Sequence, residues 1–233
     1  MSRIFVDSEL EPGGVLKLPP DETNHVYNVL RGTNEDFIEV VDGEGRLFTA
    51  RLSSGGEAAV VEELEAPGRT GVEISLYQAV PKGGRMDLVV EKATEVGATR
   101  IVPLLAERGI VTPRAGKVGR WRRVAEAAAR QALRLSVPEV AEPVRFEDAA
   151  SEVGETGVLL HNAPGLQPIE AVVEAPASLF VGPEGGWSEG ELLLAEEAGI
   201  TLGVLGPYRL RSETAGIIAV ARTLAALESG VER

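Results

Sequence analysis

The segment FVGPEGGWS, residues 180–188, carries the sharpest chemical signature in the chain, because three glycines and a proline follow an apolar run. Glycine lets a backbone approach a ligand closely and adopt positive φ angles. The segment lacks the Lys-Ser/Thr pair of a P-loop and the spacing of a dinucleotide fingerprint. The carboxylate of Glu184 would also compete with phosphate for the amides of a following helix. We therefore expect a neutral or cationic ligand here, and the alternative is a tight strand–helix turn that binds nothing.

A second segment, LGPYRLRSETAG (205–216), leads from an apolar strand into a helix. Ser212 is the expected cap of that helix, and Glu213 and Thr214 fall in its first turn, where free amides and a partial positive charge gather. Ordinary capping accounts for Ser212 and Glu213 in the simplest interpretation. Arg211, between an apolar strand and an apolar helix, requires either solvent or an anion.

Basic residues are concentrated in the middle of an acidic chain. The net charge is −13, yet residues 100–145 hold 10 Lys and Arg against 4 Asp and Glu. Three arginines of this block share one face of a helix predicted over 118–135: Arg123, Arg130 and Arg134. The helix is either solvated, with Arg122, Glu126 and Arg130 forming an i,i+4 ladder, or directed toward the phosphates of a nucleic acid.

Other candidate groups are weaker. Lys82 and Arg85 lie on the glycine-rich loop AVPKGGRMD (79–87), which forms either a second phosphate contact or a flexible turn. His161 is expected at a strand end, and His25 on a short helix, where a packing role is the commoner outcome. The chain has no cysteine and only these two histidines, so we expect no metal site.

Alternating strands and helices are expected to position these segments. Strands are predicted over 72–80, 100–106, 157–163, 177–182 and 200–206, and helices over 86–97, 118–135, 188–198 and 212–227. Ser188 and Glu191 have the spacing of a capping box. The order predicts an α/β domain with a parallel sheet and helices on both faces. Ligands bind such sheets at the carboxyl ends of the strands, so the loops 161–165, 182–187 and 206–214 are expected to meet.

The first 70 residues are predicted to form a separate β domain. IEVVDG (38–43) and RLFTARL (46–52) flank a Gly-Glu-Gly turn and predict a hairpin. Further strands are predicted over 3–6 and 15–18, a short helix over 21–30, and a linker over 65–71. We therefore expect domains at 1–70 and 71–233. With no apolar run that could cross a bilayer and no signal-peptide core, the protein is expected to be cytoplasmic.

The motifs resemble those of one family. QAVPKGGRMDLVVEKATEVGATRIVPLLAERGIV (78–111), LFVGPEGGWSEGEL (179–192) and LGPYRLRSETA (205–215) resemble the ribosomal RNA small-subunit methyltransferase E family, and HVYNVLRG (25–32) and VVDGEGRLFTARL (40–52) resemble its N-terminal domain. The resemblance implies a SPOUT-type catalytic domain with a trefoil-knotted parallel sheet, preceded by a PUA-like β-barrel that holds RNA, in a homodimer. It implies an enzyme that uses S-adenosylmethionine to methylate N3 of one uridine in small-subunit (16S) ribosomal RNA.

The resemblance also assigns residues. It implies cofactor contacts at Leu160, His161, Gly182, Pro183, Glu184, Gly185, Gly186, Leu205, Gly206, Leu210, Thr214 and Ala215. It implies RNA contacts at Arg31, Lys82, Arg85 and Arg211, to which the basic helix adds Arg123, Arg130 and Arg134. Two positions depart from the family pattern: Arg130 stands where a glutamate is usual, and Tyr208 where an arginine is common.

Methyl transfer from a sulfonium depends mainly on positioning the two reactants. Arg211 is the candidate to stabilise negative charge on the uracil ring, and Glu184 and Glu213 are the carboxylates nearest the expected site. Three alternatives remain: ribose 2′-O-methylation on the same fold, a non-catalytic RNA-binding or assembly module, and a phosphate- or dinucleotide-binding enzyme. Glu184 and the missing fingerprint weigh against the last of these.

Overall fold

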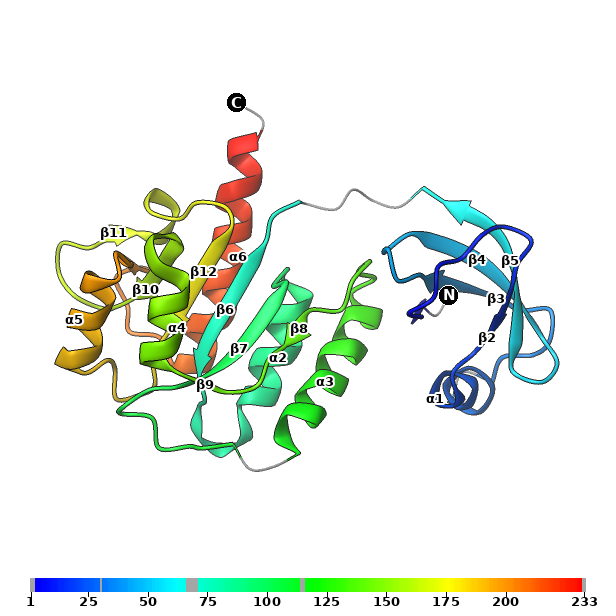
Figure 1. Cartoon of the computed structure of the whole chain (residues 1–233), viewed down its shortest axis with the longest axis horizontal. Helices are drawn as coiled ribbons and strands as arrows, with labels where there is room; N and C mark the ends of the chain where they lie inside the picture. The colour runs from blue at the N-terminus through cyan, green and yellow to red at the C-terminus, as the bar shows by residue number, and fades with distance from the viewer. Residues whose placement is uncertain (1–2, 30, 66–70, 114–115, 232–233) are drawn as a thin grey trace. The chain divides into compact units, whose positions relative to one another are not determined.

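The computed structural model describes residues 3–29, 31–65, 71–113 and 116–231, and the chain divides into two compact units (Figure 1). The N-terminal unit comprises Met1–Arg69 with Ala129–Ser136, and the C-terminal unit comprises Thr70–Ala128 with Val137–Arg233. The predicted linker over 65–71 lies almost entirely outside the described residues.

The N-terminal unit is a curled sheet of five short strands around its own apolar core. The strands, in the spatial order β1-β3-β4-β5-β2, are β1 (Arg3–Phe5), β3 (Phe37–Val41), β4 (Leu47–Ser53), β5 (Glu57–Leu64) and β2 (Val15–Lys17). β1 and β3 are parallel and the other pairs antiparallel, which confirms the predicted hairpin over β3 and β4. Helix α1 (Pro20–Asn24) continues into a π-helical turn η1 (His25–Val29), in place of the single helix predicted there.

The β3–β4 turn is held by one buried carboxylate. Asp42 accepts hydrogen bonds from the backbone N–H groups of Glu44 and Arg46, at 3.0 and 2.9 Å, and from the Arg46 guanidinium. Burial alone would raise the pKa of Asp42, but the hydrogen bonds from Arg46 hold it below its usual range. The turn is therefore fixed by local contacts that the Asp-Gly-Glu-Gly sequence already contains.

Residues 129–136, at and after the end of helix α3 (Lys117–Gln131), group with the N-terminal unit. The guanidinium of Arg3 donates to Glu39 at 2.7 Å and to the carbonyl oxygens of Leu133 and Arg134. Arg130 pairs with the buried carboxylate of Glu22. Because of these contacts, residues 129–136 belong to the N-terminal unit. The domain boundary predicted at residue 70 would assign them to the C-terminal domain.

The C-terminal unit is built on an eight-stranded sheet whose pairings are all parallel. Its strands, in the order β11-β13-β10-β12-β6-β7-β8, are β11 (Gln167–Pro168), β13 (Thr201–Val204), β10 (Gly157–Leu160), β12 (Ala177–Val181), β6 (Ile74–Ala79), β7 (Arg100–Leu105) and β8 (Glu139–Val140), with β9 (Val144–Arg145) also paired to β7. The order confirms the predicted α/β class with a parallel sheet.

Helices cover both faces of this sheet, as predicted. Successive strand residues point to opposite faces, so Leu179 joins the core under α2 (Met86–Glu95), α3 and α6 (Ser212–Val231), while its neighbour Phe180 joins the core under α4 (Phe146–Val153) and α5 (Glu189–Glu197). Figure 1 shows α4 and α5 on the side of the sheet opposite to α2, α3 and α6. Short 3₁₀ turns lie at Lys82–Gly84, Gly154–Thr156 and Ile169–Ala171.

Candidate active site

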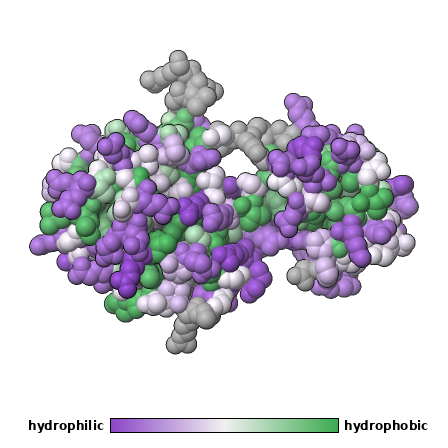
Figure 2. All heavy atoms as spheres, viewed as in Figure 1, coloured by the Kyte–Doolittle hydropathy of each residue, from purple (hydrophilic) through white to green (hydrophobic). Residues whose placement is uncertain are grey.

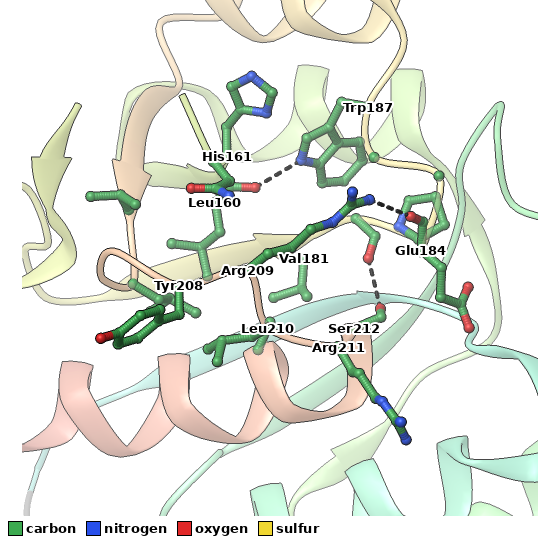
Figure 3. A pocket seen from close by; sticks show the side chains of 18 of the residues that line it. Leu160, His161, Val181, Glu184, Trp187, Tyr208, Arg209, Leu210, Arg211 and Ser212 are labelled. Carbon is green, nitrogen blue, oxygen red and sulfur yellow. Dashed lines mark hydrogen bonds between the residues drawn. The ribbon is translucent and has the colours of Figure 1, made fainter. Parts of the chain in front are cut away.

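A pocket opens where the neighbouring strands β13, β10 and β12 end at their carboxyl edges (Figure 3). Its cavity volume is about 630 Å³. The lining comes from residues 160–162, 181–187 and 204–212 except Pro207, together with Arg108 and Ala215. The structure thus brings together the three loops that follow separate strands in the sequence.

Most of the residues that the sequence assigned to the cofactor line this pocket: Leu160, His161, Gly182, Pro183, Glu184, Gly185, Gly186, Leu205, Gly206, Leu210 and Ala215. Thr214 stands apart, exposed on the first turn of α6. Glu184 and Arg211, assigned to catalysis, are in the lining, whereas Glu213 is buried in the first turn of α6. The lining also includes residues that the sequence did not assign: Arg108, Asn162, Val181, Trp187, Val204, Tyr208, Arg209 and Ser212.

The glycine loop, residues 182–186, is shaped by close backbone packing. A Cβ on Gly182 would come within 3.0 Å of the buried ring of Trp187. The indole N–H of Trp187 donates to Leu160 O at 3.0 Å and so joins the end of β10 to this loop (Figure 3). Gly186 has a φ of 71°, which glycine adopts without strain, and its N–H donates to Pro183 O at 2.9 Å. The glycines are therefore required by packing as well as by any ligand.

Helix α6 starts beside this loop, and its first residue, Ser212, is not the helix cap that the sequence predicted. The Ala215 N–H donates to Arg211 O at 2.8 Å, so Arg211 and not Ser212 occupies the N-cap position. The hydroxyl of Ser212 instead donates to Gly182 O at 2.7 Å and accepts from Gln78 Nε2 (Figure 3). The expected helix cap is therefore a contact with the glycine loop.

Two arginines hold the outer side of the glycine loop. Arg209 donates to Glu184 O at 2.9 Å, and Arg108 donates to Gly185 O at 3.3 Å. With the bonds described above, each carbonyl oxygen of residues 182–185 accepts from another protein group, so the loop offers a ligand mainly its amide N–H groups. Sequence reasoning missed both arginines because their partners lie 25 and 77 residues away.

The acidic and basic candidates near the pocket form one cluster. The Arg85 guanidinium lies 3.4 Å from the buried carboxylate of Glu213 and 4.0 Å from that of Glu184. The backbone N–H of Lys82 donates to Glu184 at 3.3 Å. Arg211 is exposed, and its guanidinium points away from the other labelled side chains in Figure 3. The two predicted RNA contacts of the 79–87 loop thus lie next to the two candidate carboxylates.

The remaining predicted RNA contacts lie outside the pocket lining. Arg31, with a φ of 58°, and Arg123 are exposed. Arg130 is half-buried against Glu22, and burial lowers the pKa of the Arg134 guanidinium. Arg130 is thus already engaged in an ion pair that phosphate would have to replace.

A further arginine supports the third loop of the pocket. Arg222, on α6, donates to Leu205 O and pairs with Glu170, to which its Nη2 donates at 2.6 Å. Burial alone would raise the pKa of Glu170, but the hydrogen bonds from Arg222 hold it below its ordinary value. The only sequence signal for this contact is an arginine inside an otherwise apolar helix.

Two family descriptions match the chain. That of the RNA methyltransferase domain matches residues 69–224, and that of the RNA methyltransferase PUA domain matches residues 18–64. The parallel sheet with its pocket and the curled N-terminal sheet are thus those of an RNA methyltransferase with a PUA domain.

Two curated relatives narrow the class. The chain is 33% identical to the ribosomal RNA small subunit methyltransferase E of Synechocystis sp., over 97% of this chain and 78% of that protein. It is 33% identical to the protein of the same name from Aquifex aeolicus, over 89% of this chain and 93% of that protein. The chain belongs to the ribosomal RNA small subunit methyltransferase E family, which confirms the family predicted from its motifs.

Two solved structures agree in fold over nearly the whole chain. The ribosomal RNA small subunit methyltransferase E from Neisseria gonorrhoeae, bound to S-adenosyl methionine, has a TM-score of 0.90 and 30% identity, covering 97% of this chain and 98% of that one. A methyltransferase from Legionella pneumophila, in complex with the cofactor SAM, has a TM-score of 0.86 and 31% identity, covering 96% and 97%.

The part of the chain that the structure describes has neither a membrane-spanning helix nor a cluster of metal-binding side chains. Its helices include none long and apolar enough to cross a bilayer, and hydrophilic side chains are spread over the face seen in Figure 2. The same described residues contain no group of three or more His, Cys, Asp or Glu placed to hold a metal ion.

Proposed function

We propose that this chain methylates N3 of one uridine in small-subunit ribosomal RNA, with S-adenosylmethionine as the methyl donor. The observation that carries the proposal is the pocket at the ends of β10, β12 and β13, whose volume of about 630 Å³ suits a cofactor of this size. Family membership supports the substrate, and the two neighbours with bound cofactor support the donor.

The lining fits this cofactor better than it fits a nucleotide polyphosphate. Leu160, Val181, Leu205 and Leu210 supply apolar surface, and the glycine loop supplies amide N–H groups. A P-loop lysine is missing from the sequence of this loop. Such a surface suits a compact cofactor that combines apolar, hydrogen-bonding and cationic parts.

When bound, the cofactor supplies a methyl group on a positively charged sulfur. The residues of this chain must then hold the uracil N3 in line with that methyl and accept the N3 proton. We assign Arg211 to the negative charge that develops on the uracil ring. Glu213 and Glu184 are the carboxylates proposed to receive the proton, and Arg85 is paired with both.

We assign RNA binding to the basic residues of both units. Lys82, Arg85 and Arg211 are exposed near the pocket, where the phosphates flanking the target uridine would lie. Further contacts are proposed at Arg31, Arg123, Arg130 and Arg134. Because phosphate contacts release counterions, the affinity for RNA is expected to fall steeply with salt.

The proposal includes an architecture. We propose an RNA-binding domain over 1–70, closed as a PUA-like barrel, and a SPOUT catalytic domain over 71–233 whose backbone is knotted at the cofactor site. Membership of the ribosomal RNA small subunit methyltransferase E family, for which the knot was expected, is the support for this architecture. We further propose a homodimer that acts in the cytoplasm, for which light scattering and cell fractionation are the tests.

Two measurements test the function. Calorimetric titration with S-adenosylmethionine should give binding, and mass mapping of ribosomal RNA from cells that lack the protein should locate one missing methyl group on a uracil N3. A methyl group missing from a ribose 2′-oxygen would replace the proposed reaction. RNA binding without cofactor binding would identify a non-catalytic module.

A further inference from the structure

A fully buried glutamine lies directly behind the glycine loop. Gln78 is the penultimate residue of β6, has 0% exposure, and pairs in register with Val181, the residue before the loop. The neighbouring strand residues Tyr77 and Ala79 are also buried, and neither has a side-chain amide. A buried amide in a strand that is otherwise built for packing requires a specific hydrogen-bonding role.

The direction of the hydrogen bonds around Gln78 is fixed by chemistry. The amide nitrogen lies 3.1 Å from Ala79 O, which can only accept, so the NH₂ group faces that side. The same nitrogen donates to Ser212 Oγ at 2.9 Å. Gly182 O can also only accept, so the Ser212 hydroxyl donates to it at 2.7 Å, and the Gln78 amide binds a lone pair of the same hydroxyl oxygen. Gln78 thus holds the Ser212 oxygen at the position from which it bonds the glycine loop.

This arrangement has two structural penalties. Within the described chain, the Oε1 atom of Gln78 is buried and has no hydrogen-bond partner. A Cβ on Gly216 would come within 2.1 Å of that oxygen, so a glycine is required inside helix α6. An unpartnered buried carbonyl and an interior helical glycine both reduce stability, and an apolar side chain of similar length would remove the first penalty.

We propose that Gln78 is a positioning residue for the methyl donor: it holds the Ser212 oxygen in place for its bond to Gly182 O and thereby sets the glycine loop against the start of α6. The inference rests on the proposed function, since it concerns the same pocket. Gln78 is outside the pocket lining and acts through Ser212, which is inside it.

The test compares cofactor affinity with thermal stability in full-length protein. Gln78→Met keeps the length of the side chain and removes the amide. The two lost hydrogen bonds lower stability and the removal of the unpartnered Oε1 raises it, so the melting temperature is expected to fall by no more than in the Thr94→Val control described below. The dissociation constant for S-adenosylmethionine, measured by calorimetry, is expected to rise about tenfold, as for the loss of one buried hydrogen bond. The KM for the cofactor should rise in parallel, with little change in kcat at saturation. A purely structural role would weaken binding no more than the Thr94→Val control of similar stability does.

A matched variant and a double variant sharpen the test. Thr94→Val removes a fully buried hydroxyl of the same unit that donates to Val90 O at 2.7 Å. Thr94 is outside the pocket lining, so this variant should lower the melting temperature and leave cofactor affinity unchanged. Ser212→Ala breaks the same chain of hydrogen bonds, so Gln78→Met in that background should add no further loss of affinity.

The inference would be overturned if Gln78→Met bound S-adenosylmethionine as tightly as the wild type. It would also be overturned if the losses of affinity in Gln78→Met and Ser212→Ala multiplied in the double variant. A wild-type protein that binds no S-adenosylmethionine would contradict the proposed function itself. The two failures are therefore distinguishable from the wild-type titration alone.

Discussion

Helices α5 and α6 both follow loops that line the pocket, yet their first turns are held in different ways. At α5, Ser188 and Glu191 form a capping box within four residues, with bonds of 3.1 and 2.8 Å. At α6, the hydroxyl of Ser212 is bound to groups 30 and 134 residues away in sequence. The first helix start is capped by its own residues, with one further bond from Glu107 N–H to Glu191, and the second joins a distant strand to the glycine loop. We infer that the α5 start mainly supports folding and the α6 start mainly supports the cofactor site.

The largest expected effect is at Glu191, which is buried and accepts from the backbone N–H groups of Ser188 and Glu107, each at 2.8 Å. Glu191→Ala leaves both donors without this acceptor, so we expect the free energy of unfolding to fall by about 2–4 kcal/mol in urea denaturation. The exposed Glu189, in the same turn, is the control, and its alanine variant should change stability by less than about 0.5 kcal/mol. A folded Glu191→Ala protein that has lost cofactor binding would break the proposed contrast.

The contrast is sharpest in a pair of identical substitutions, Ser188→Ala and Ser212→Ala. Each removes one buried hydroxyl at a helix start, and each should lower the free energy of unfolding by about 1–2 kcal/mol. Only Ser212→Ala is expected to weaken S-adenosylmethionine binding, by about tenfold or more, because its hydroxyl holds Gly182 O. Equal affinities in the two variants would show that the two helix starts do not differ in function.

The same contrast explains what the sequence could predict. The capping box and the β3–β4 turn depend on residues a few positions apart, so their spacing identified them. Strand β5 was missed because EAAVVEEL is rich in residues common in helices, and it is a strand because it pairs with β4. Helix α4 was missed because no side chain caps its start.

In the site, the loops were predictable and the groups that support them were not. Glycines and strand ends mark residues 182–186 and 205–206 in the sequence itself. The contacts of Arg108, Arg209 and Arg222 with those loops span 17 to 77 residues along the chain. Gln78 reaches the glycine loop through Ser212, which lies 134 residues away in sequence. No local pattern encodes such contacts, because they depend on how the strands are ordered in the sheet.

A smaller effect is expected at Glu170, whose partner Arg222 lies on α6 and holds Leu205 O. A carboxylate whose pKa is lower in the folded protein than in the unfolded chain stabilises the fold above the unfolded pKa, and the stabilisation disappears as pH falls through the folded pKa. Glu170→Gln is therefore expected to lower the free energy of unfolding by about 0.5–1 kcal/mol at neutral pH, for a pair this exposed. The difference from wild type should shrink below about pH 4.

Denaturation curves at several pH values measure this difference, and calorimetry at neutral pH should give a few-fold weaker cofactor affinity because Leu205 lines the pocket. A difference in stability that is constant from neutral to acidic pH would show that the ion pair is not its source. The Glu170→Gln variant thus tests a second contact between α6 and a distant part of the chain, the ion pair of Arg222 with Glu170.

The smallest effect is expected at Tyr208, which is 81% exposed before α6 and points outward in Figure 3. Nothing in the fold requires an aromatic ring here, so Tyr208→Arg should change stability by less than about 0.5 kcal/mol. If this loop faces RNA, the added charge should tighten RNA binding a few-fold at low salt and steepen the slope of log affinity against log salt by about one. Tyr208→Gln separates the charge from the loss of the ring. Equal RNA affinities for the arginine and glutamine variants would show that the loop before α6 does not contact RNA phosphates. The start of α6 would then serve the cofactor site alone.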